Sequence, residues 1–380
     1  MAFPQENPSK LFSPLPIGPY TLSNRIVMAP LTRFRASDTH VPLLPIVAQH
    51  YAQRACVPGT LLISEASVIS PSAGGVPHAP GIWNAEQIQA WKHVVQAVHK
   101  KGGVIFCQLW ALGRAASAEV KKAEGTGDVM SASAVPMSEG APAPRALEEE
   151  EIQGYIKAYA SAARNAVEGA GFDGVEIHAA NGYLVDQFTQ DVSNTRTDAW
   201  GGSVAKRARF ALEVTRAVVE AVGPERTALR LSPWSTFQGM RMQDPVPQFM
   251  YLLEHLKEMG RLAYLHLVES RIAGNADVER TEKITSFVEA WGQHSPVLVA
   301  GGFTPDSARR LVEEEMKERD VAVVFGRYFI STPDLVFRVA KGIPLSPYDR
   351  EDFYRPMVAE GYVDYPFSEE WVREKGAFQL

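Results

Sequence analysis

Short apolar runs of strand type recur along the chain, each bounded by glycine, proline or charged residues. Runs of this length and composition are typical of buried β-strands. Eight of them occur, and longer segments of a different periodicity separate them. The runs are RIVMAP (25–30), GTLLISEA (59–66), GGVIFCQLW (102–110), GVEIHAA (174–180), TALRLSP (227–233), LAYLHLVE (262–269), PVLVAGG (296–302) and VAVVFGR (321–327).

Between these runs, apolar residues return at intervals of three and four, which predicts helices with one buried face. Helix start signals agree with this spacing: Asn84 with Gln87 forms a capping-box pattern, and Thr304-Pro305 and Thr332-Pro333 each place a cap residue before a proline. The clearest helical segments contain Ile88, Trp91, Val94, Val95 and Val98, and then Ile152, Tyr155, Ile156, Tyr159, Ala163, Ala166 and Val167.

Alternation of eight strands with helices predicts parallel strands joined by helical crossovers, and eight such units close into a (β/α)8 TIM barrel. No linker-like stretch interrupts the pattern, so residues 1–380 are expected to form one domain. Residues 11–26 are expected to form a turn-rich N-terminal hairpin that plugs the barrel. The extended segment after strand three, residues 111–147, is too long for a plain connection and is expected to be a lid or binding loop.

The composition is that of an ordinary globular protein, with 46% hydrophobic and 22% charged residues. The net charge of -6 argues against nucleic acid and anionic membranes as partners, and small molecules remain. The two cysteines, Cys56 and Cys107, are too few for an iron-sulfur cluster. Neither a leader sequence nor an apolar stretch of membrane-spanning length is evident, so a cytoplasmic protein is expected.

Three proton-donating side chains follow the fourth strand in the run GVEIHAANGYL, namely His178, Asn181 and Tyr183. An imidazole and a carboxamide three residues apart can donate hydrogen bonds to one oxygen, and a phenol nearby can supply a proton. A polarised carbonyl group fits such a set. The alternative is a core histidine satisfied by its neighbours, although catalytic groups gather at the C-terminal ends of barrel strands.

Strand alternation directs further polar side chains to the barrel interior. Gln108 shares its parity with Trp110 in strand three, and Arg230 is a lone charge between two leucines in strand five. An arginine in that position needs an anionic partner. The partner is either a ligand at the barrel mouth or Glu176, which shares the parity of His178.

The last two strands end in AGG (300–302) and FGR (325–327), where barrels of this type commonly bind phosphate. Glycines let backbone N–H groups approach an anion, and an arginine pairs with it, so Arg327 is the expected phosphate ligand. Close packing between strand and helix is the alternative. Thr32 could hydrogen-bond a ligand or stabilise a turn. Tyr354 could fold back over the pocket, beside a packing Phe353.

Together these residues resemble the Old Yellow Enzyme family of flavin-dependent ene-reductases, in its fungal branch. The resemblance runs from about Leu11 to Phe367. Within that branch, WGQHSPVLVAGGF (291–303) and FCQLWALGRAA (106–116) look most like the ergot-alkaloid chanoclavine aldehyde reductases. The motifs that carry it are APLTR (29–33), QLW (108–110), HAANGYLVDQF (178–188), NTRTDAWGGS (194–203), GRYFISTPDL (326–335) and FYRPMVAEGYVDYP (353–366).

The resemblance implies FMN bound across the C-terminal mouth of the barrel, reduced by NADPH or NADH. Its phosphate is expected on Gly301, Gly302, Gly326 and Arg327, and its ring near Pro30, Leu31, Thr32, Ala66, Gln108 and Arg230. Ala66 stands where many members have glycine. Trp110 and Tyr354 are expected to contact the substrate.

The implied reaction reduces the activated C=C bond of an α,β-unsaturated aldehyde or ketone. His178 and Asn181 hold the carbonyl oxygen, hydride passes from the flavin to the β carbon, and Tyr183 protonates the α carbon. In this branch phenylalanine at the tyrosine position gives an isomerase, so Tyr183 predicts a reductase.

Several alternatives stay open from the sequence. A metal-dependent hydrolase is one, although strand one ends in Ala-Pro and offers no ligand. A dedicated isomerase or reductase of one fungal metabolite and a non-catalytic flavin-binding module are others. The choice between NADPH and NADH, the physiological substrate, and a homodimer as against a monomer are not determined, since substrate choice depends on residues 111–147 and 270–285.

Overall fold

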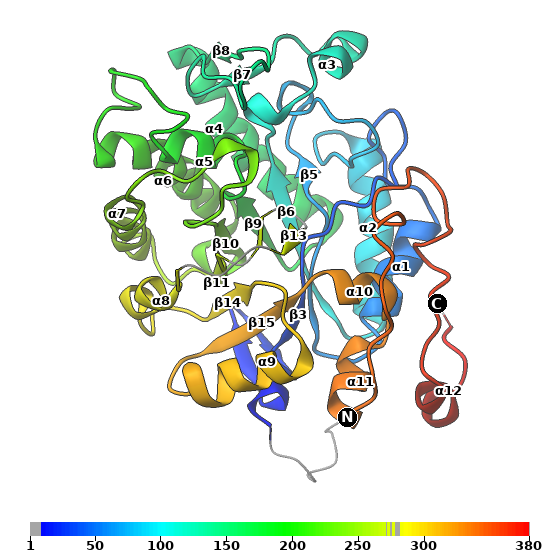
Figure 1. The fold of residues 1–380 in the computed structure, drawn as a ribbon. Helices are drawn as coiled ribbons and strands as arrows, with labels where there is room; N and C mark the ends of the chain where they lie inside the picture. Colours follow the sequence, from blue (N-terminus) through cyan, green and yellow to red (C-terminus); the bar gives the residue numbers. More distant parts are fainter. Residues whose placement is uncertain (1–8, 271, 274–275, 278–281, 380) are drawn as a thin grey trace.

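Eight parallel strands close into a barrel with helices around it (Figure 1). The computed structural model describes residues 9–270, 272–273, 276–277 and 282–379. Each barrel strand pairs with the next, and the eighth pairs with the first, so the expected (β/α)8 barrel is confirmed. In order, the barrel strands are β3 (Ile26–Met28), β4 (Leu61–Ile63), β6 (Val104–Trp110), β9 (Gly174–His178), β10 (Thr227–Leu231), β11 (Tyr264–Val268), β14 (Val297–Ala300) and β15 (Val321–Phe325).

Helices cover the outside of the barrel because their apolar faces pack on the outward-facing strand residues. The two helices with the clearest sequence periodicity are α2 and α4, and the second continues as a short π-helical stretch over Asn165–Ala170. The helices are α1 (Ile46–Arg54), α2 (Ala85–Lys100), α3 (Ala118–Glu124), α4 (Glu149–Arg164), α5 (Leu184–Thr189), α6 (Val204–Val222), α7 (Val246–Lys257), α8 (Thr285–Trp291), α9 (Pro305–Arg310), α10 (Arg327–Ser331), α11 (Leu335–Lys341) and α12 (Glu369–Lys375).

Two of the three predicted helix caps are confirmed. Asn84 accepts from the Gln87 backbone N–H at 2.9 Å, and Thr304 caps α9 in the same way through Ser307. The prediction for Thr332-Pro333 is wrong, because Thr332 ends α10 and Asp334 precedes α11. The Thr332 hydroxyl instead accepts a hydrogen bond from Ser346 N, a contact with a distant segment that the local sequence does not indicate.

The N-terminal hairpin forms part of the barrel interior. Strands β1 (Leu15–Ile17) and β2 (Tyr20–Leu22) pair in antiparallel register, and the turn between them has Gly18 at φ +53. Leu15, Ile17 and Leu22 are buried in the same apolar cluster as the inward-facing residues Phe106 and Ala228. The expected plug is therefore confirmed, and it closes the barrel end opposite to the strand carboxyl ends.

The extended segment after β6 is folded rather than a plain loop. It contains α3 and two short strands, β7 (Met130–Ser131) and β8 (Arg145–Ala146), which pair with each other. A further short strand, β5 (Ser67–Val68), pairs with the C-terminal end of β6. The loop expected at 270–285 lies partly outside the described residues, and β12 (Ile272–Ala273) and β13 (Ala276–Asp277) pair within it.

Candidate functional site

A cavity of about 880 Å³ lies at the carboxyl ends of the barrel strands. Segments that are far apart in sequence meet there because parallel strands all point their ends to one side of a barrel. Every residue predicted for the site lines this cavity. They are Pro30, Leu31, Thr32, Ala66, Gln108, Trp110, His178, Asn181, Tyr183, Arg230, Gly301, Gly302, Gly326, Arg327 and Tyr354.

The end of β9 presents the three candidate catalytic residues to the cavity. His178 is the last residue of the strand, and Asn181 follows in the left-handed conformation with φ 58. Asparagine tolerates this conformation better than most residues, and such positions cluster at functional sites. The turn is held on both sides: Asn181 N donates to Ser232 Oγ at 2.7 Å, and Gln238 Nε2 donates to Asn181 O at 3.0 Å.

His178 is buried and electrically neutral. Burial lowers the pKa of its imidazole well below the usual value, and the charges of Arg230 and His266 lower it further. Its Nδ1 has no hydrogen-bond partner among the described residues. A buried polar nitrogen without a partner is costly, so a ligand atom is expected to complete its bonding. This makes the core-histidine alternative the weaker interpretation.

Tyr183 keeps its proton near neutral pH. Burial raises the pKa of its phenol to about 12, although the neighbouring Gln238 amide acts in the opposite direction. The ring stands edge-on to His178 at a centroid distance of 4.8 Å and edge-on to Trp110 at 5.0 Å. A protonated phenol held beside two cavity-lining rings is a candidate proton donor.

A polar network fills the barrel beneath the cavity. Glu176 is fully buried and accepts hydrogen bonds from Gln108 Nε2 at 2.7 Å and His266 Nδ1 at 2.8 Å. Although burial works to raise the pKa of Glu176, the adjacent His266 and the charge of Arg230 hold it below the usual value. The Gln108 amide is thereby oriented with its N–H toward Glu176, which leaves its carbonyl oxygen to accept from a ligand.

The sequence left two possible partners for Arg230, a ligand at the barrel mouth or Glu176, and the structure agrees in part with each. Glu176 attracts its charge, but the two side chains form no ion pair within 4 Å in the part of the chain described. Its Nε has no hydrogen-bond partner among those same residues. The arginine is therefore balanced at a distance by Glu176 and still available to an anionic ligand atom in the cavity.

We expect Glu176→Gln to weaken flavin binding by about tenfold, the effect of losing one or two hydrogen bonds to a charged group. The substitution removes the charge that orients Gln108 and balances Arg230. Titration of apoprotein with FMN, followed by the loss of flavin fluorescence, measures the effect. The exposed Glu369→Gln serves as a control, and equal flavin affinity in the two variants would contradict the expected role of Glu176.

The glycines and the arginine that were predicted to bind phosphate lie at the ends of the last two strands. Gly301 and Gly302 follow β14, and Gly302 has φ 64, a conformation that favours glycine. Gly326 and Arg327 follow β15, and the Arg327 guanidinium lies over the ring of Tyr348 at 5.3 Å. Backbone N–H groups and a guanidinium at one end of the cavity suit a phosphate.

The donor set of the cavity fits FMN. Buried polar atoms without described partners, His178 Nδ1, Arg230 Nε and Trp110 Nε1, lie on residues that line it. Gln108 offers an amide edge for the pyrimidine part of a flavin, and the glycine-arginine end offers a phosphate site. Pro30, Leu31 and Ala66 give an apolar surface for the ring system.

The C-terminal segment forms one rim of the cavity and is held by buried arginines. Arg33 donates to Phe353 O at 2.9 Å and to Gly361 O at 2.6 Å, and Arg35 donates to Val358 O at 3.0 Å. Tyr354 lies on this rim with 48% of its surface exposed, and Phe353 packs beneath it as expected. These arginine contacts could not be predicted from the sequence, because they join residues more than three hundred positions apart.

Buried Glu65 adjoins this arginine pair and accepts from Arg33 N at 3.2 Å. Burial raises its pKa to about 7, and the Arg33 hydrogen bond and nearby charges oppose the rise. The folded state thus keeps a proton on Glu65 that the unfolded chain releases above the ordinary carboxyl pKa of 4.5. Its contribution to stability is complete below that value and is lost as pH rises through about 7.

We therefore expect Glu65→Gln to flatten the pH dependence of unfolding. The unfolding free energy of the wild type should fall relative to the variant by about 3 kcal/mol between about pH 4 and about pH 8. Denaturant unfolding at a series of pH values measures the difference. Two profiles that stay parallel over this range would show that Glu65 does not titrate as described.

Several cavity residues were not found from the sequence. Met137 comes from the extended segment, and Phe237 and Gln238 come from a turn after β10. The positive φ values of Gln238 and Gly239 mark that turn, but only the Gly239 could be suspected from sequence. The other unpredicted lining residues include Phe34, Val76, Pro77, Leu112, Ala115, Ser117, Phe303, Tyr328 and Ile330.

Within the described ranges, no group of three or more His, Cys, Asp and Glu side chains is placed to hold a metal ion. Among the helices that the structure describes, none combines the length and the apolar character needed to cross a membrane.

Comparisons with known proteins agree with the fit of the cavity residues to FMN. A family model described as "NADH:flavin oxidoreductase / NADH oxidase family" matches residues 10–346. A chanoclavine-I aldehyde reductase of Penicillium roqueforti is 62% identical over 96% of this chain and 98% of its own length. An NADP-dependent oxidoreductase of Aspergillus flavus is 54% identical, with the same coverages.

Two further matches place the chain in a wider group. A Claviceps purpurea relative, 54% identical over 96% of this chain and 97% of its own, is named a probable inactive dehydrogenase. The crystal structure of Old Yellow Enzyme from Pichia sp. AKU4542 superimposes with a TM-score of 0.88 at 38% identity, over 95% of this chain and 94% of that one. The chain therefore belongs to the NADH:flavin oxidoreductase family and is an FMN oxidoreductase of the Old Yellow Enzyme type.

Proposed function

We propose that this enzyme reduces the activated C=C bond of an α,β-unsaturated aldehyde or ketone, with His178, Asn181 and Tyr183 as its catalytic residues. One observation carries the proposal: the end of β9 sets a neutral, unpartnered imidazole and a carboxamide beside a protonated phenol in one cavity. When bound, FMN supplies the hydride that is added to the β carbon, after NADPH has reduced it.

The proposed cofactor contacts lie at two ends of the cavity, one for the phosphate and one for the pyrimidine edge of the flavin. Gly301, Gly302, Gly326 and Arg327 would hold the phosphate, because glycine backbones and a guanidinium converge there. At the other end, Gln108 and Arg230 would hold the pyrimidine edge, with Glu176 fixing the amide. Pro30, Leu31, Thr32 and Ala66 would line the ring, and the Thr32 hydroxyl could donate to it.

His178 and Asn181 would hold the carbonyl oxygen of the substrate. Negative charge develops on this oxygen as the enolate forms, so a neutral imidazole N–H and an amide N–H stabilise the transition state more than the ground state. The low pKa of His178 favours this role, since the imidazole donates without carrying a charge of its own. Held on both sides of its turn, Asn181 needs little reorganisation to do so.

Tyr183 would protonate the α carbon of the enolate. Its high pKa keeps the proton in place until a strongly basic carbon is formed. Trp110 restricts the ring from the other side and would contact the substrate together with Tyr354. Because the chain carries this tyrosine, we propose a reductase rather than an isomerase dedicated to one metabolite.

The apolar lining of the cavity favours an aldehyde with a large apolar body. Phe34, Leu112, Met137, Phe237 and Tyr354 all contribute to this lining. Rings and thioethers of this kind suit an extended hydrophobic substrate. The relatives named as aldehyde reductases support the same chemical class.

The test is a panel of α,β-unsaturated aldehydes, cyclic enones and maleimides, each assayed with NADPH and with NADH on protein reconstituted with FMN. We expect NADPH-dependent saturation of the C=C bond, detected as the saturated product, with bulky enals preferred. A flavin-loaded protein that oxidises NADPH but saturates no member of the panel would favour the non-catalytic flavin-binding alternative.

Three further features belong to the proposal. Residues 1–380 would work as one flavin-binding barrel domain, because the cavity draws on strand ends from the whole barrel. A cytoplasmic setting is supported by the thiols of Cys56 and Cys107, which are both unpaired. A homodimer would be tested by sedimentation of the holoenzyme.

A further inference from the structure

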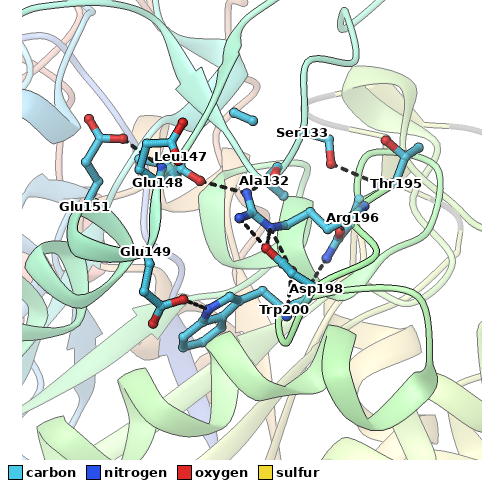
Figure 2. Close-up of polar contacts among 12 residues, drawn as sticks. Ala132, Ser133, Leu147, Glu148, Glu149, Glu151, Thr195, Arg196, Asp198 and Trp200 are labelled. Carbon is cyan, nitrogen blue, oxygen red and sulfur yellow. Dashed lines mark hydrogen bonds and ion pairs between the residues drawn. The ribbon is translucent and has the colours of Figure 1, made fainter.

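One sequence motif has no part in the cavity. The run NTRTDAWGGS (194–203) lies between α5 and α6, and none of its residues lines the cavity. The Arg196 side chain is only 13% exposed. Its buried contacts therefore have a role other than lining the cavity. Figure 2 shows these contacts on the extended segment that follows β6.

Arg196 holds both ends of a loop with one nitrogen. Its Nη1 donates to Ala132 O at 2.9 Å and to Leu147 O at 2.7 Å (Figure 2). These two residues directly follow β7 and β8, so the loop formed by residues 133–146 begins and ends at the same guanidinium. We call Ala132, Ser133 and Leu147 the neck of this loop, and Thr195 N adds a third hydrogen bond to it, to Ser133 Oγ at 3.0 Å.

The guanidinium is itself fixed. Asp198 accepts from Arg196 Nε and Nη2, the second at 2.6 Å, and its other oxygen accepts from Trp200 N at 2.9 Å. The Trp200 indole N–H donates in turn to Glu149 in α4. A charge-assisted pair with two bonds gives the arginine one orientation, and the neck of the loop is therefore anchored to the barrel helices.

The far part of the loop reaches the substrate side of the cavity. Arg114 donates to Val135 O and Pro136 O, both at 3.3 Å, and to Gln238 O at 3.1 Å. Met137 follows and lines the cavity next to the turn that carries Phe237 and Gln238. A side chain at Gly239 would meet Met137 O at 2.5 Å, so the loop and this turn are in close contact.

We propose that Arg196 is a positioning residue that sets the outer wall of the substrate pocket through Met137, and so determines how tightly a bulky apolar substrate is bound. Met137 is the specificity-determining residue of that wall. The inference rests on the proposed function for its substrate class. The anchoring of the loop rests on the contacts alone, so the two are tested separately.

The test compares Arg196→Met with a matched control, Arg338→Met. Arg338 pairs with Asp334 at 2.8 Å and bridges Pro344 O and Pro366 O, each at 3.1 Å, so it loses the same kinds of contact when replaced. Its side chain is 9% exposed, close to that of Arg196, and it does not line the cavity.

For Arg196→Met we expect a rise of about tenfold in KM for a bulky ring-bearing enal, the size of effect that a displaced apolar wall produces. The kcat/KM for a small enal, the affinity for FMN and the rate of flavin reduction by NADPH should stay at the wild-type values. Met137→Ala should reproduce the change in KM, and Arg196→Lys should lie between the variant and the wild type.

A second measurement does not use activity. Glu139 lies in the exposed tip of the loop, and a glutamate-specific protease should cut there faster in Arg196→Met than in Arg338→Met or Met137→Ala. The proposal would be overturned if Arg196→Met lowered kcat/KM equally for the bulky and the small enal. It would also be overturned if the ratio of the two kcat/KM values stayed as in the wild type. If wild type reduces no enal, the proposed function fails, and unchanged cleavage at Glu139 would then separately refute the anchoring.

Discussion

Replacing Tyr183 by Phe should slow reduction of the C=C bond by a factor of about 100 to 10,000, the range in which a positioned general acid contributes. The phenol is the protonated group beside His178, with a pKa raised to about 12, and phenylalanine keeps its ring and packing against Trp110 while removing the proton. Reduction of the flavin by NADPH needs no proton from this phenol, so that half-reaction should stay nearly unchanged. Rapid-mixing measurements of the two half-reactions separate these effects.

Tyr354→Phe is the matched control for this experiment, because its phenol also lines the cavity but stands on the exposed rim. Its hydroxyl is not proposed to transfer a proton, so the rate of C=C reduction should change far less than in Tyr183→Phe. Equal damage to both half-reactions in Tyr183→Phe would remove this residue from the role of proton donor. Accumulation of an isomerised instead of a saturated product would link the reductase outcome to this hydroxyl directly.

His178→Ala should lower the rate of enone reduction by about a hundredfold, and Asn181→Ala should do the same, as expected for loss of one donor to a developing oxyanion. We expect phenols to bind in this site as phenolates and to give a long-wavelength charge-transfer band with the flavin. That band should weaken in His178→Ala, because the imidazole is one of the two groups proposed to stabilise the phenolate oxygen. Titration with a phenol, followed by absorbance, measures the effect.

His255→Ala is a suitable control for the histidine variant. His255 lies on α7 and bonds its own helix through Tyr251 O, away from the cavity. Its phenol titration should match the wild type. An unchanged band in His178→Ala would show that the carbonyl oxygen is held elsewhere, and the unpartnered Nδ1 would then need a different ligand.

The two outcomes together distinguish the alternatives that the sequence left open. Loss of C=C reduction with intact NADPH oxidation fits a reductase whose acid has been removed. A wild type that binds phenols and consumes NADPH but saturates no substrate fits a flavin-binding module. Both cases give a flavin-loaded protein, so flavin content by itself does not decide between them.

The strand pattern in the sequence predicted the architecture correctly. Short apolar runs marked the eight barrel strands, and the alternation of side chains along a strand placed Gln108 and Arg230 inside the barrel, where the structure has them. The hairpin plug and the cap at Asn84 were also predicted, because each depends on residues within a few positions of one another. The motif resemblance identified cavity residues correctly because strand ends in this fold always face the same side.

Contacts between distant segments were not predictable in this way. Thr332 looked like a helix cap, yet its hydroxyl bonds Ser346 across a loop. The resemblance located Arg196 within a motif but not its bonds to Ala132 and Leu147, which lie 64 and 49 positions away. Glu176 could be named only as one candidate partner of Arg230, whereas it actually bonds Gln108 and His266.

The sequence by itself therefore determined the barrel and its plug, which follow from local periodicity and turn residues. Through motifs that resemble a known family, it also indicated part of the residues at the barrel mouth. Only the tertiary structure decided which buried charges share a partner, which arginines hold the C-terminal rim, and which loop supplies Met137 to the pocket wall. The physical reason is that these contacts are hydrogen bonds between segments remote in sequence, and no periodicity along the chain encodes their geometry.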